Sequence, residues 1–160
     1  MKRKIILVFL VLAFSNVLYF LVFHHSAIPL DKTVLFDEQN RAVSMDEYNK
    51  TVRIISFYQT WCGDCRREML DLNQLQRRFG DRLKFIMISD EDYDIVHPMK
   101  AYLDVNFIFL RSEQQLKNIG VRRYPTTYLI DKQGKVILVE KEGKNWNSEK
   151  MIEKIGKLLD

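Results

Sequence analysis

Residues 57–69 read FYQTWCGDCRREM and are the most informative segment of the chain for its fold. It joins an apolar, β-rich run at residues 52–58 to an amphipathic pattern at residues 66–79, in which apolar side chains recur every three or four positions. Cys62 and Cys65 therefore lie at a predicted strand-to-helix junction. Unpaired N–H groups and the helix dipole at a helix start favour an anion, which predicts that Cys62 is a thiolate nucleophile. Two intervening residues bring the sulfurs within disulfide distance, so the pair can alternate between dithiol and disulfide.

A CxxC motif by itself also occurs as half of a zinc site or as a structural disulfide. The chain has two cysteines and three histidines. His24 and His25 adjoin an apolar amino-terminal run, so only His97 remains as a further nitrogen ligand, and we expect no metal site. A structural disulfide that closes so short a loop would restrict the unfolded chain very little. Redox exchange is the favoured interpretation, with the other two kept as alternatives.

The amino terminus predicts a membrane anchor. Residues 5–23 carry no charge, and a helix of that length covers about 28 Å, close to the thickness of the bilayer hydrocarbon. Three cations at residues 2–4 place the amino terminus in the cytoplasm by the positive-inside rule. We expect a cytoplasmic terminus and a signal-anchor transmembrane helix over residues 1–25, and an extracytoplasmic, periplasmic domain over residues 26–160. Cleavage as a signal peptide, which would give a secreted domain, is the alternative.

The composition describes one folded domain with little net charge outside the amino terminus. Of the 160 residues, 47% are hydrophobic and 29% are charged, as in a packed globular domain and not in a disordered polymer. The formal net charge is +4, and residues 2–4 supply three of these charges. A domain so close to neutral has little electrostatic drive to bind a phosphate backbone, so we expect no nucleic-acid partner.

The rest of the chain alternates predicted strands and helices. Apolar, β-rich runs indicate strands at residues 83–89, 126–130 and 135–140, with shorter ones at 106–110 and in a hairpin around 37–40. Helices are indicated at residues 112–120, at 148–159 and around 99–103, where Pro98 predicts that the helix starts or bends. This order favours an α/β fold with a central mixed sheet, parallel inner strands, flanking helices and a closing antiparallel hairpin.

A second motif introduces the third of the longer strands. Residues 120–136 read GVRRYPTTYLIDKQGKV, and Pro125 stands sixty residues after Cys65. Because proline cannot donate a ladder hydrogen bond, Pro125 fits either the start of an edge strand or a turn with a cis peptide bond.

Together the two motifs resemble the thioredoxin-like superfamily, most closely the membrane-anchored, extracytoplasmic thiol-disulfide oxidoreductases of the TlpA/ResA type. Three separated features carry the resemblance: the Trp-Cys-x-x-Cys junction, the Arg-x-Glu-Met that follows it, and the Tyr-Pro-Thr-Thr strand entry with its Leu-Ile-Asp-x-x-Gly-Lys hairpin. The similarity of motifs covers about residues 52–139. It implies a thioredoxin-like fold preceded by one transmembrane helix, with a redox-active disulfide.

The resemblance also implies roles for residues near the cysteines. Pro125 would be the cis-proline beside the dithiol, and Tyr124 would offer backbone groups to an extended substrate segment. Trp61 is expected to cap the site and to support contact with the substrate, with ordinary packing as the alternative. Glu68 lies three residues past Cys65 on one helix face, so it could relay protons to that thiol and raise its pKa. The alternative is a solvated glutamate near the helix start.

Two residues depart from the family pattern. Asp64 stands where proline usually precedes the second cysteine, and Ser56 stands where thioredoxins keep a buried aspartate. Asp64 should disfavour the Cys62 thiolate and make the couple more reducing. Arginines at residues 66, 67, 122 and 123 act in the opposite sense if they face the thiols, and otherwise form a solvated rim.

The sequence therefore predicts an enzyme, a membrane-anchored extracytoplasmic thiol-disulfide oxidoreductase that reduces protein disulfides through Cys62 and Cys65. The chain has no NADPH or flavin motif, so we expect no cofactor besides the disulfide and infer a membrane electron donor that reduces the site again. Apocytochrome haem-binding cysteines, as in cytochrome c maturation, are one candidate substrate. The alternative is a non-catalytic, membrane-tethered binding or assembly chaperone, for metal delivery or cytochrome assembly, that uses the thioredoxin-like surface without turnover.

Overall fold

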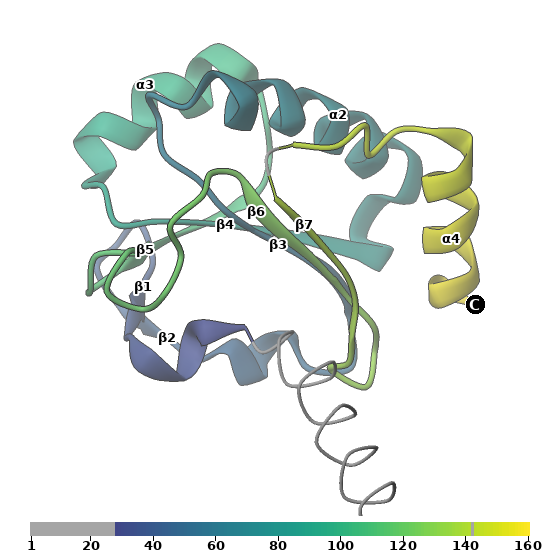
Figure 1. Ribbon diagram of the computed structural model, residues 1–160, viewed down its shortest axis with the longest axis horizontal. Coiled ribbons are helices and arrows are strands. Elements are labelled where there is room, and N and C mark those ends of the chain that lie inside the picture. Colours follow the sequence, from purple (N-terminus) through teal and green to yellow (C-terminus); the bar gives the residue numbers. More distant parts are fainter. Residues whose placement is uncertain (1–27, 142) are drawn as a thin grey trace, which may run out of the picture.

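The computed structural model describes residues 28–141 and 143–160, which form one seven-stranded sheet with α-helices packed on it (Figure 1). The strands are, in chain order, β1 (Leu35–Phe36), β2 (Ala42–Val43), β3 (Val52–Phe57), β4 (Leu83–Ser89), β5 (Ile108–Ser112), β6 (Thr126–Ile130) and β7 (Val136–Lys141). Their order across the sheet is β2-β1-β5-β4-β3-β6-β7. The predicted strands at residues 83–89 and 126–130 are confirmed with the same bounds.

The inner strands are parallel, as predicted. β4 runs parallel to both β3 and β5, with Ile86 opposite Ile55 on one side and Ile108 on the other. Every residue of β3 is buried, the pattern of a strand that is covered on both faces. β6 pairs antiparallel with β3 and with β7, and β1 pairs antiparallel with β5 and with β2. The sheet is therefore mixed, and β6 and β7 form the predicted antiparallel hairpin.

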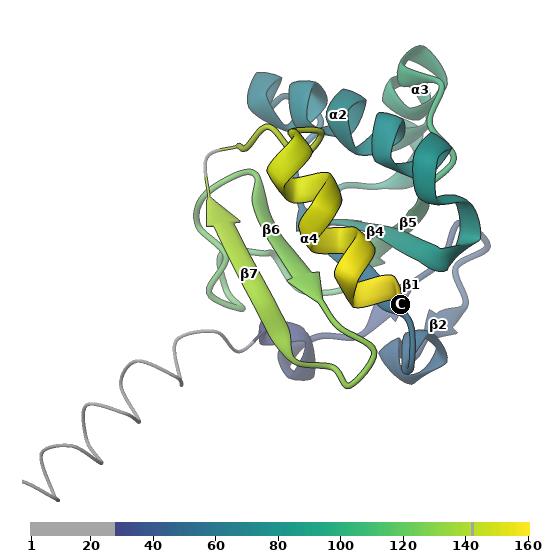
Figure 2. The same cartoon turned by 90° about the vertical axis from the view of Figure 1, so that its right-hand side faces the viewer.

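Three α-helices pack against one face of the sheet: α2 (Gly63–Phe79), α3 (Tyr93–Leu103) and α4 (Glu149–Leu159). Figure 1 shows α2 and α3 along that face, and Figure 2 looks onto α4, which runs in nearly the same direction as β6 and β7. Each helix contributes an apolar stripe to one shared core, for example Leu72 from α2, Met99 from α3 and Ile155 from α4. Spacing of three and four residues places such side chains on one side of a helix.

The opposite face of the sheet is covered by shorter segments. They are the 3-10 turns η2 (Pro29–Lys32) and η3 (Met45–Tyr48) and the irregular residues 113–121. Leu116, Ile119 and Val121 from this last segment pack with sheet residues in a second buried core. The two cores lie on opposite sides of the sheet, so residues that alternate along a strand reach different surroundings.

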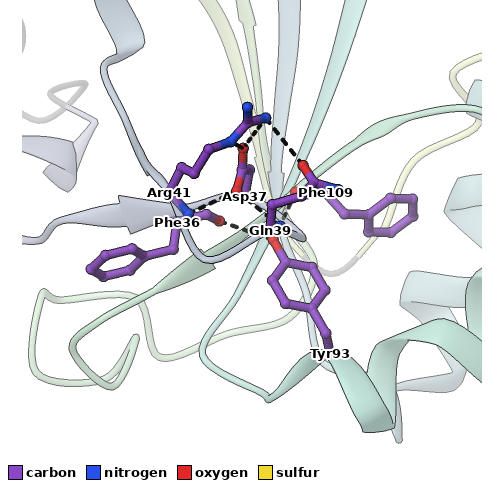
Figure 3. Close-up of polar contacts among 6 residues, drawn as sticks. All are labelled: Phe36, Asp37, Gln39, Arg41, Tyr93 and Phe109. Carbon is purple, nitrogen blue, oxygen red and sulfur yellow. Dashed lines mark hydrogen bonds and ion pairs between the residues drawn. The ribbon is translucent and has the colours of Figure 1, made fainter.

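The predicted amino-terminal hairpin is present and is tied to the sheet (Figure 3). The carboxylate of Asp37 accepts hydrogen bonds from the backbone N–H and the Nε–H of Arg41, at 2.8 and 2.7 Å, which close the turn between β1 and β2. The hydroxyl of Tyr93 lies 2.9 Å from the carbonyl oxygen of Phe36 and 3.0 Å from that of Phe109. The first residue of α3 therefore joins β1 to β5.

The helix predicted at residues 112–120 is wrong. Ser112 ends β5, and the following residues form hydrogen-bonded turns. The N–H of Leu116 donates to Oδ2 of Asp90 at 2.8 Å. The N–H of Val121 donates to the carbonyl of Leu116 at 2.9 Å, five residues back instead of four. Gly120 has a φ of +101°, which an α-helix does not contain. The carboxylate of Asp90, 26 residues earlier in the chain, thus binds the N–H group of Leu116. In an α-helix that group would donate to the carbonyl four residues back.

The helix predicted to start or bend at Pro98 begins earlier. α3 starts after Asp92, whose carbonyl accepts the N–H of Val96 at 3.3 Å, and it continues through Pro98. Proline inside the helix removes one backbone hydrogen bond. Burial of Val96 and Met99 in the core offsets that loss, because each removes apolar area from water.

The predicted transmembrane helix at residues 5–23, and with it the proposed boundary between residues 25 and 26, lies outside the described residues. Within residues 28–141 and 143–160, no helix is both long enough and apolar enough to cross a bilayer.

Candidate active site

Cys62 and Cys65 form a disulfide at the start of α2, with their Cα atoms 5.3 Å apart. α2 begins at Gly63, before the predicted residue 66, so Cys62 is the N-cap residue and Cys65 lies in the first turn. The Sγ of Cys62 accepts a hydrogen bond from the N–H of Cys65 at 3.1 Å. An N–H group directed at this sulfur favours its anion after reduction. Cys62 is 7% exposed and Cys65 is 1% exposed, so Cys62 is the sulfur that a partner reaches first.

The loop that carries the disulfide is held by two acidic residues that follow β4. The carboxylate of Glu91 accepts hydrogen bonds from the N–H and the hydroxyl of Thr60, both at 2.7 Å, and from the hydroxyl of Ser89 at 3.0 Å. Asp90 accepts a hydrogen bond from Nε2 of Gln59 at 2.6 Å. β3 and β4 are adjacent and parallel, so both end at the same edge of the sheet. Residues after β4 can therefore fix the backbone just before the disulfide.

Glu68 is buried one turn along α2 from Cys65 and is 3% exposed. Its Oε1 accepts hydrogen bonds from the hydroxyls of Thr127, at 2.5 Å, and Ser56, at 3.3 Å. Its Oε2 accepts one from Nε1–H of Trp146 at 2.8 Å. The alternative of a solvated glutamate is wrong. Ser56, where thioredoxins keep an aspartate, is part of this network and also lies 2.7 Å from the hydroxyl of Thr127.

Burial raises the pKa of Glu68 above its ordinary value, because the ionised carboxylate loses its hydration. The hydrogen bonds from Thr127, Trp146 and Ser56 act in the opposite direction, because they stabilise the ionised form. Cys65 and Glu68 are three residues apart, so they share one face of α2. The site therefore pairs a buried sulfur with a buried carboxyl group that can hold or release a proton.

Trp61 and Tyr124 form an aromatic wall next to the disulfide. Trp61 is 70% exposed, which contradicts the alternative of ordinary packing. Its ring meets that of Tyr124 edge to face, with the centroids 6.0 Å apart. The Tyr124–Pro125 peptide bond is cis, as the resemblance implies. β6 follows Pro125 and lies between β3 and β7, so the alternative of an edge-strand start is wrong.

Asp64, between the two cysteines, forms an ion pair with Arg67 one turn along α2. Both side chains are half exposed or more, so the pair adds little to stability. It nevertheless places a positive charge against the acidic group beside Cys62. Arg66 lies 3.5 Å from a carbonyl oxygen of the preceding loop. The arginines at residues 122 and 123 line a different groove, so the predicted arginine rim is divided between two surfaces.

A groove of about 560 Å³ opens beside α2 and reaches Glu68. It is bounded by α2 and by the segment between β7 and α4, and its lining residues are Asp64, Arg67, Glu68, Leu70, Asp71, Gln74, Gly143, Lys144 and Asn145. Side chains of both charges face the groove. The groove connects the region of the buried carboxyl group with the solvent.

The arrangement supplies the chemistry of thiol-disulfide exchange. The two sulfurs accept two electrons and two protons when the disulfide is reduced to the dithiol. In the part of the chain that the structure describes, no three His, Cys, Asp or Glu side chains lie close enough together to hold a metal ion.

Four residues of this site were not predicted from the sequence: Thr127, Trp146, Asp90 and Glu91. Trp146 is fully buried, although it lies in a polar segment 78 residues after Glu68. A large aromatic residue in a polar loop is the one signal that indicates its burial. Thr127 belongs to the Tyr-Pro-Thr-Thr motif, and Glu91 belongs to an acidic run after β4. Their partners depend on strand pairing and leave no local pattern.

Comparison with known proteins agrees with this geometry. Residues 24–158 match the Redoxin family. The chain is 29% identical over 143 residues to the thiol-disulfide oxidoreductase ResA of Geobacillus thermodenitrificans, a match that covers 84% of this chain and 82% of that protein. It is 28% identical over 109 residues to ResA of Bacillus thuringiensis, covering 65% of this chain and 62% of that protein.

The fold agrees as well. A crystal structure of a putative thiol:disulfide interchange protein DsbE from Chlorobium tepidum superposes with a TM-score of 0.67 at 23% identity, covering 79% of this chain and 92% of that one. The Redoxin match spans most of the chain and includes both cysteines, the cis-proline and Glu68. The chain therefore belongs to the Redoxin family and is a thioredoxin-like thiol-disulfide oxidoreductase of the TlpA/ResA type.

Proposed function

We propose that residues 5–23 anchor this protein in the cytoplasmic membrane, that residues 26–160 form its extracytoplasmic domain, and that this domain reduces protein disulfides. The observation that carries the proposal is the disulfide at the start of α2, in which Cys62 is the more exposed sulfur and accepts the N–H of Cys65. The uncharged run at residues 5–23, preceded by three cations, supports the anchor and its orientation.

The reaction runs in two exchange steps. The thiolate of Cys62 attacks one sulfur of the substrate disulfide, the substrate S–S bond breaks, and the second substrate sulfur leaves as a thiolate. Cys65 then attacks the sulfur of Cys62 in this mixed disulfide and releases the first substrate sulfur. Two electrons pass from the enzyme dithiol to the substrate. The released thiolates take up the two protons that Cys62 and Cys65 give up.

Glu68 accepts the proton of Cys65 in the second step. Cys65 is almost fully buried and must lose its proton before it can attack, because the thiolate is the nucleophile. Glu68 is on the same helix face, and burial raises its pKa, which makes the carboxylate a better proton acceptor. The groove beside α2 lets Glu68 return that proton to water.

Trp61, Tyr124 and Pro125 bind the substrate. The exposed ring of Trp61 and the ring of Tyr124 give an apolar wall against which the segment around a substrate disulfide can pack. The backbone of Tyr124 offers hydrogen-bonding groups to an extended substrate chain. This contact fixes the substrate sulfur in front of Cys62.

Each turnover leaves the Cys62–Cys65 disulfide, so a second partner must reduce it. The donor we propose is a membrane protein that carries a dithiol, because the chain has no motif for a soluble electron carrier. The net reaction then moves two electrons from the donor to the substrate.

Trapping tests the roles of the two cysteines. With Cys65→Ser, Cys62 can attack but nothing resolves the adduct, so disulfide-linked substrate should accumulate on a non-reducing gel. With Cys62→Ser, exchange and trapping should both be lost. Abundant trapping by Cys62→Ser would contradict the assignment. A wild-type protein with inert thiols, no reduction of insulin and tight stoichiometric metal uptake would favour the chaperone alternative.

Two further measurements test the direction of electron transfer and the compartment in which the domain lies. A reductant should have a reduction potential at or below about −200 mV, well below the roughly −120 mV of a strong dithiol oxidant, and a value near the latter would reverse the proposed direction. A membrane-impermeant maleimide should label the reduced thiols in intact spheroplasts. Labelling only after lysis would place the domain in the cytoplasm.

A further inference from the structure

A second groove, which we call the basic groove, lies on the face of the sheet opposite α2 and α4. It has a volume of about 340 Å³, and its lining residues are Pro29, Lys32, Ile119, Gly120, Val121, Arg122, Arg123, Thr126, Tyr128 and Lys141. Ile119, Val121 and Tyr128 belong to the second buried core, which separates this groove from the core beneath α2 and α4. Buried apolar side chains of that core therefore lie beneath the groove, and cationic side chains line its exposed surface.

The basic groove begins where the proposed substrate-binding loop ends. Arg122 and Arg123 directly precede Tyr124, whose ring touches that of Trp61 beside the disulfide. Thr126, on the other side of the cis peptide bond, lines the groove and pairs with Lys141 across the β6–β7 hairpin. A polypeptide that places its disulfide against Cys62 and continues past the cis-proline loop would enter this groove.

The charged side chains that the structure describes in the lining of this groove are cationic. Lys32, Arg122 and Lys141 are exposed and form no ion pair within the residues that the structure describes, whereas Arg123 has a partner. Four of the lining residues are cations, and none of the lining side chains that the structure describes is a carboxylate. The groove beside α2, in contrast, is lined by both charges. In a domain that is almost neutral overall, this cluster creates a local positive field that attracts anionic groups.

We propose that the basic groove binds an acidic polypeptide segment that flanks the substrate's disulfide, and so selects substrates with Asp or Glu near the target cysteines. The inference rests on the proposed function. A polypeptide is favoured over a lipid headgroup because the groove continues from the loop that contacts the substrate. An extended acidic segment would lay its carboxylates against Arg122 and Lys141.

Two matched disulfide peptides test the inference with the purified full-length protein. They differ only in the residues on both sides of the cysteines, which are Asp and Glu in one peptide and Asn and Gln in the other. We expect the wild type to show a kcat/KM about fivefold higher for the acidic peptide at low salt, since exposed ion pairs are individually weak and two of them act together. The ratio should approach one at 1 M salt, because salt screens exposed charges.

Variants of the basic groove test whether its cations cause the preference for the acidic peptide. In Arg122→Gln/Lys141→Gln the ratio of kcat/KM for the acidic peptide to kcat/KM for the amide peptide should fall to about one. In Arg122→Glu/Lys141→Glu the same ratio should drop below one. The matched control is Lys150→Gln/Lys154→Gln, which removes two exposed lysines from α4 on the opposite face and should keep the wild-type ratio. Each variant is first compared with the wild type by circular dichroism, since these exposed side chains contribute no buried contact.

Four results would overturn the inference. A wild-type ratio near one, or a ratio that survives both groove variants, would show that the groove does not select acidic segments. Binding to phosphatidylglycerol vesicles that disappears in Arg122→Gln/Lys141→Gln, without any change in the peptide ratio, would assign the groove to a lipid surface instead. A wild type that reduces neither peptide would refute the proposed function, and this inference with it.

Discussion

Replacing Thr127 by valine should change the charge state of Glu68 without touching either cysteine. Thr127 is fully buried, and its hydroxyl donates a hydrogen bond to Oε1 of Glu68 at 2.5 Å. Valine has a similar shape but no donor, so the ionised carboxylate loses one of its three side-chain partners. Trp146 and Ser56 still donate to it. We expect the pKa of Glu68, already raised by burial, to rise further.

The size of the effect follows from the strength of this hydrogen bond. A hydrogen bond to a charged group contributes about 1.5–3 kcal/mol. About 1.4 kcal/mol corresponds to a tenfold change in an equilibrium constant. Because two donors remain and can move closer to the carboxylate, we take the lower end of the range. The acid dissociation constant of Glu68 in Thr127→Val should therefore be about tenfold smaller than in the wild type.

The assay follows the side-chain carboxyl carbon of Glu68 by NMR through a pH titration of protein labelled with ¹³C-glutamate. Glu68→Gln identifies the signal, because only that resonance disappears. The matched control is Thr126→Val. Thr126 is also buried, and its hydroxyl donates to the carbonyl of Arg123 at 2.8 Å instead of to Glu68. The control should titrate like the wild type.

Two results would refute this reasoning. If Glu68 titrates at the same pH in Thr127→Val and in the wild type, the hydroxyl does not stabilise the carboxylate. If Thr126→Val shifts the titration as much as Thr127→Val does, the cause is a general loosening of β6. Either result would also weaken the role of Glu68 as a proton acceptor whose pKa is set by this network.

Three more predictions concern single side chains. The pKa of Glu68 is higher in the folded than in the unfolded chain, so its contribution to stability is full below about pH 4.3 and is lost as the pH rises through the folded pKa. Glu68→Gln should therefore flatten the fall in urea-unfolding free energy with rising pH, and an unchanged slope would contradict the assignment. Trp61→Ala should leave the unfolding free energy within about 0.5 kcal/mol, because the side chain is 70% exposed. The same variant should lower kcat/KM for a disulfide peptide at least about threefold, as expected when an aromatic contact is removed, and equal kinetics would exclude a role in binding. Glu91→Gln should lower the unfolding free energy by about 1–2 kcal/mol, because its amide cannot accept both hydrogen bonds from Thr60, and a urea titration that overlays the wild type would show that this contact contributes nothing.

Most of the fold could be predicted because the central strands are buried on both faces. A strand covered by core on each side consists of a continuous apolar run, so β4 and β6 are visible in the sequence with their bounds. The segment at residues 112–120 could not be predicted in this way. Its helical pattern is overridden by the hydrogen bond between Leu116 and Asp90, two residues brought together only when β4 and β5 pair.

The candidate site also has some features that follow from local sequence and others that do not. The position of Cys62 and Cys65 follows from two intervening residues at a helix start, which is local geometry. The environment of Glu68 is not local, because its donors Thr127 and Trp146 lie 59 and 78 residues further along the chain. No periodicity in the sequence could indicate that these three side chains meet.

The longer strands, the amphipathic helix and the position of the two sulfurs could be predicted from local sequence, because apolar spacing and helix-end chemistry act over a few neighbouring residues. The burial of Glu68, and the position of Arg122 and Lys141 in the lining of one groove, depend on the tertiary structure. The physical reason is that burial and electrostatic surroundings depend on which distant segments the sheet brings side by side. The same glutamate could be solvated, and the same cations could be scattered, under a different pairing of strands.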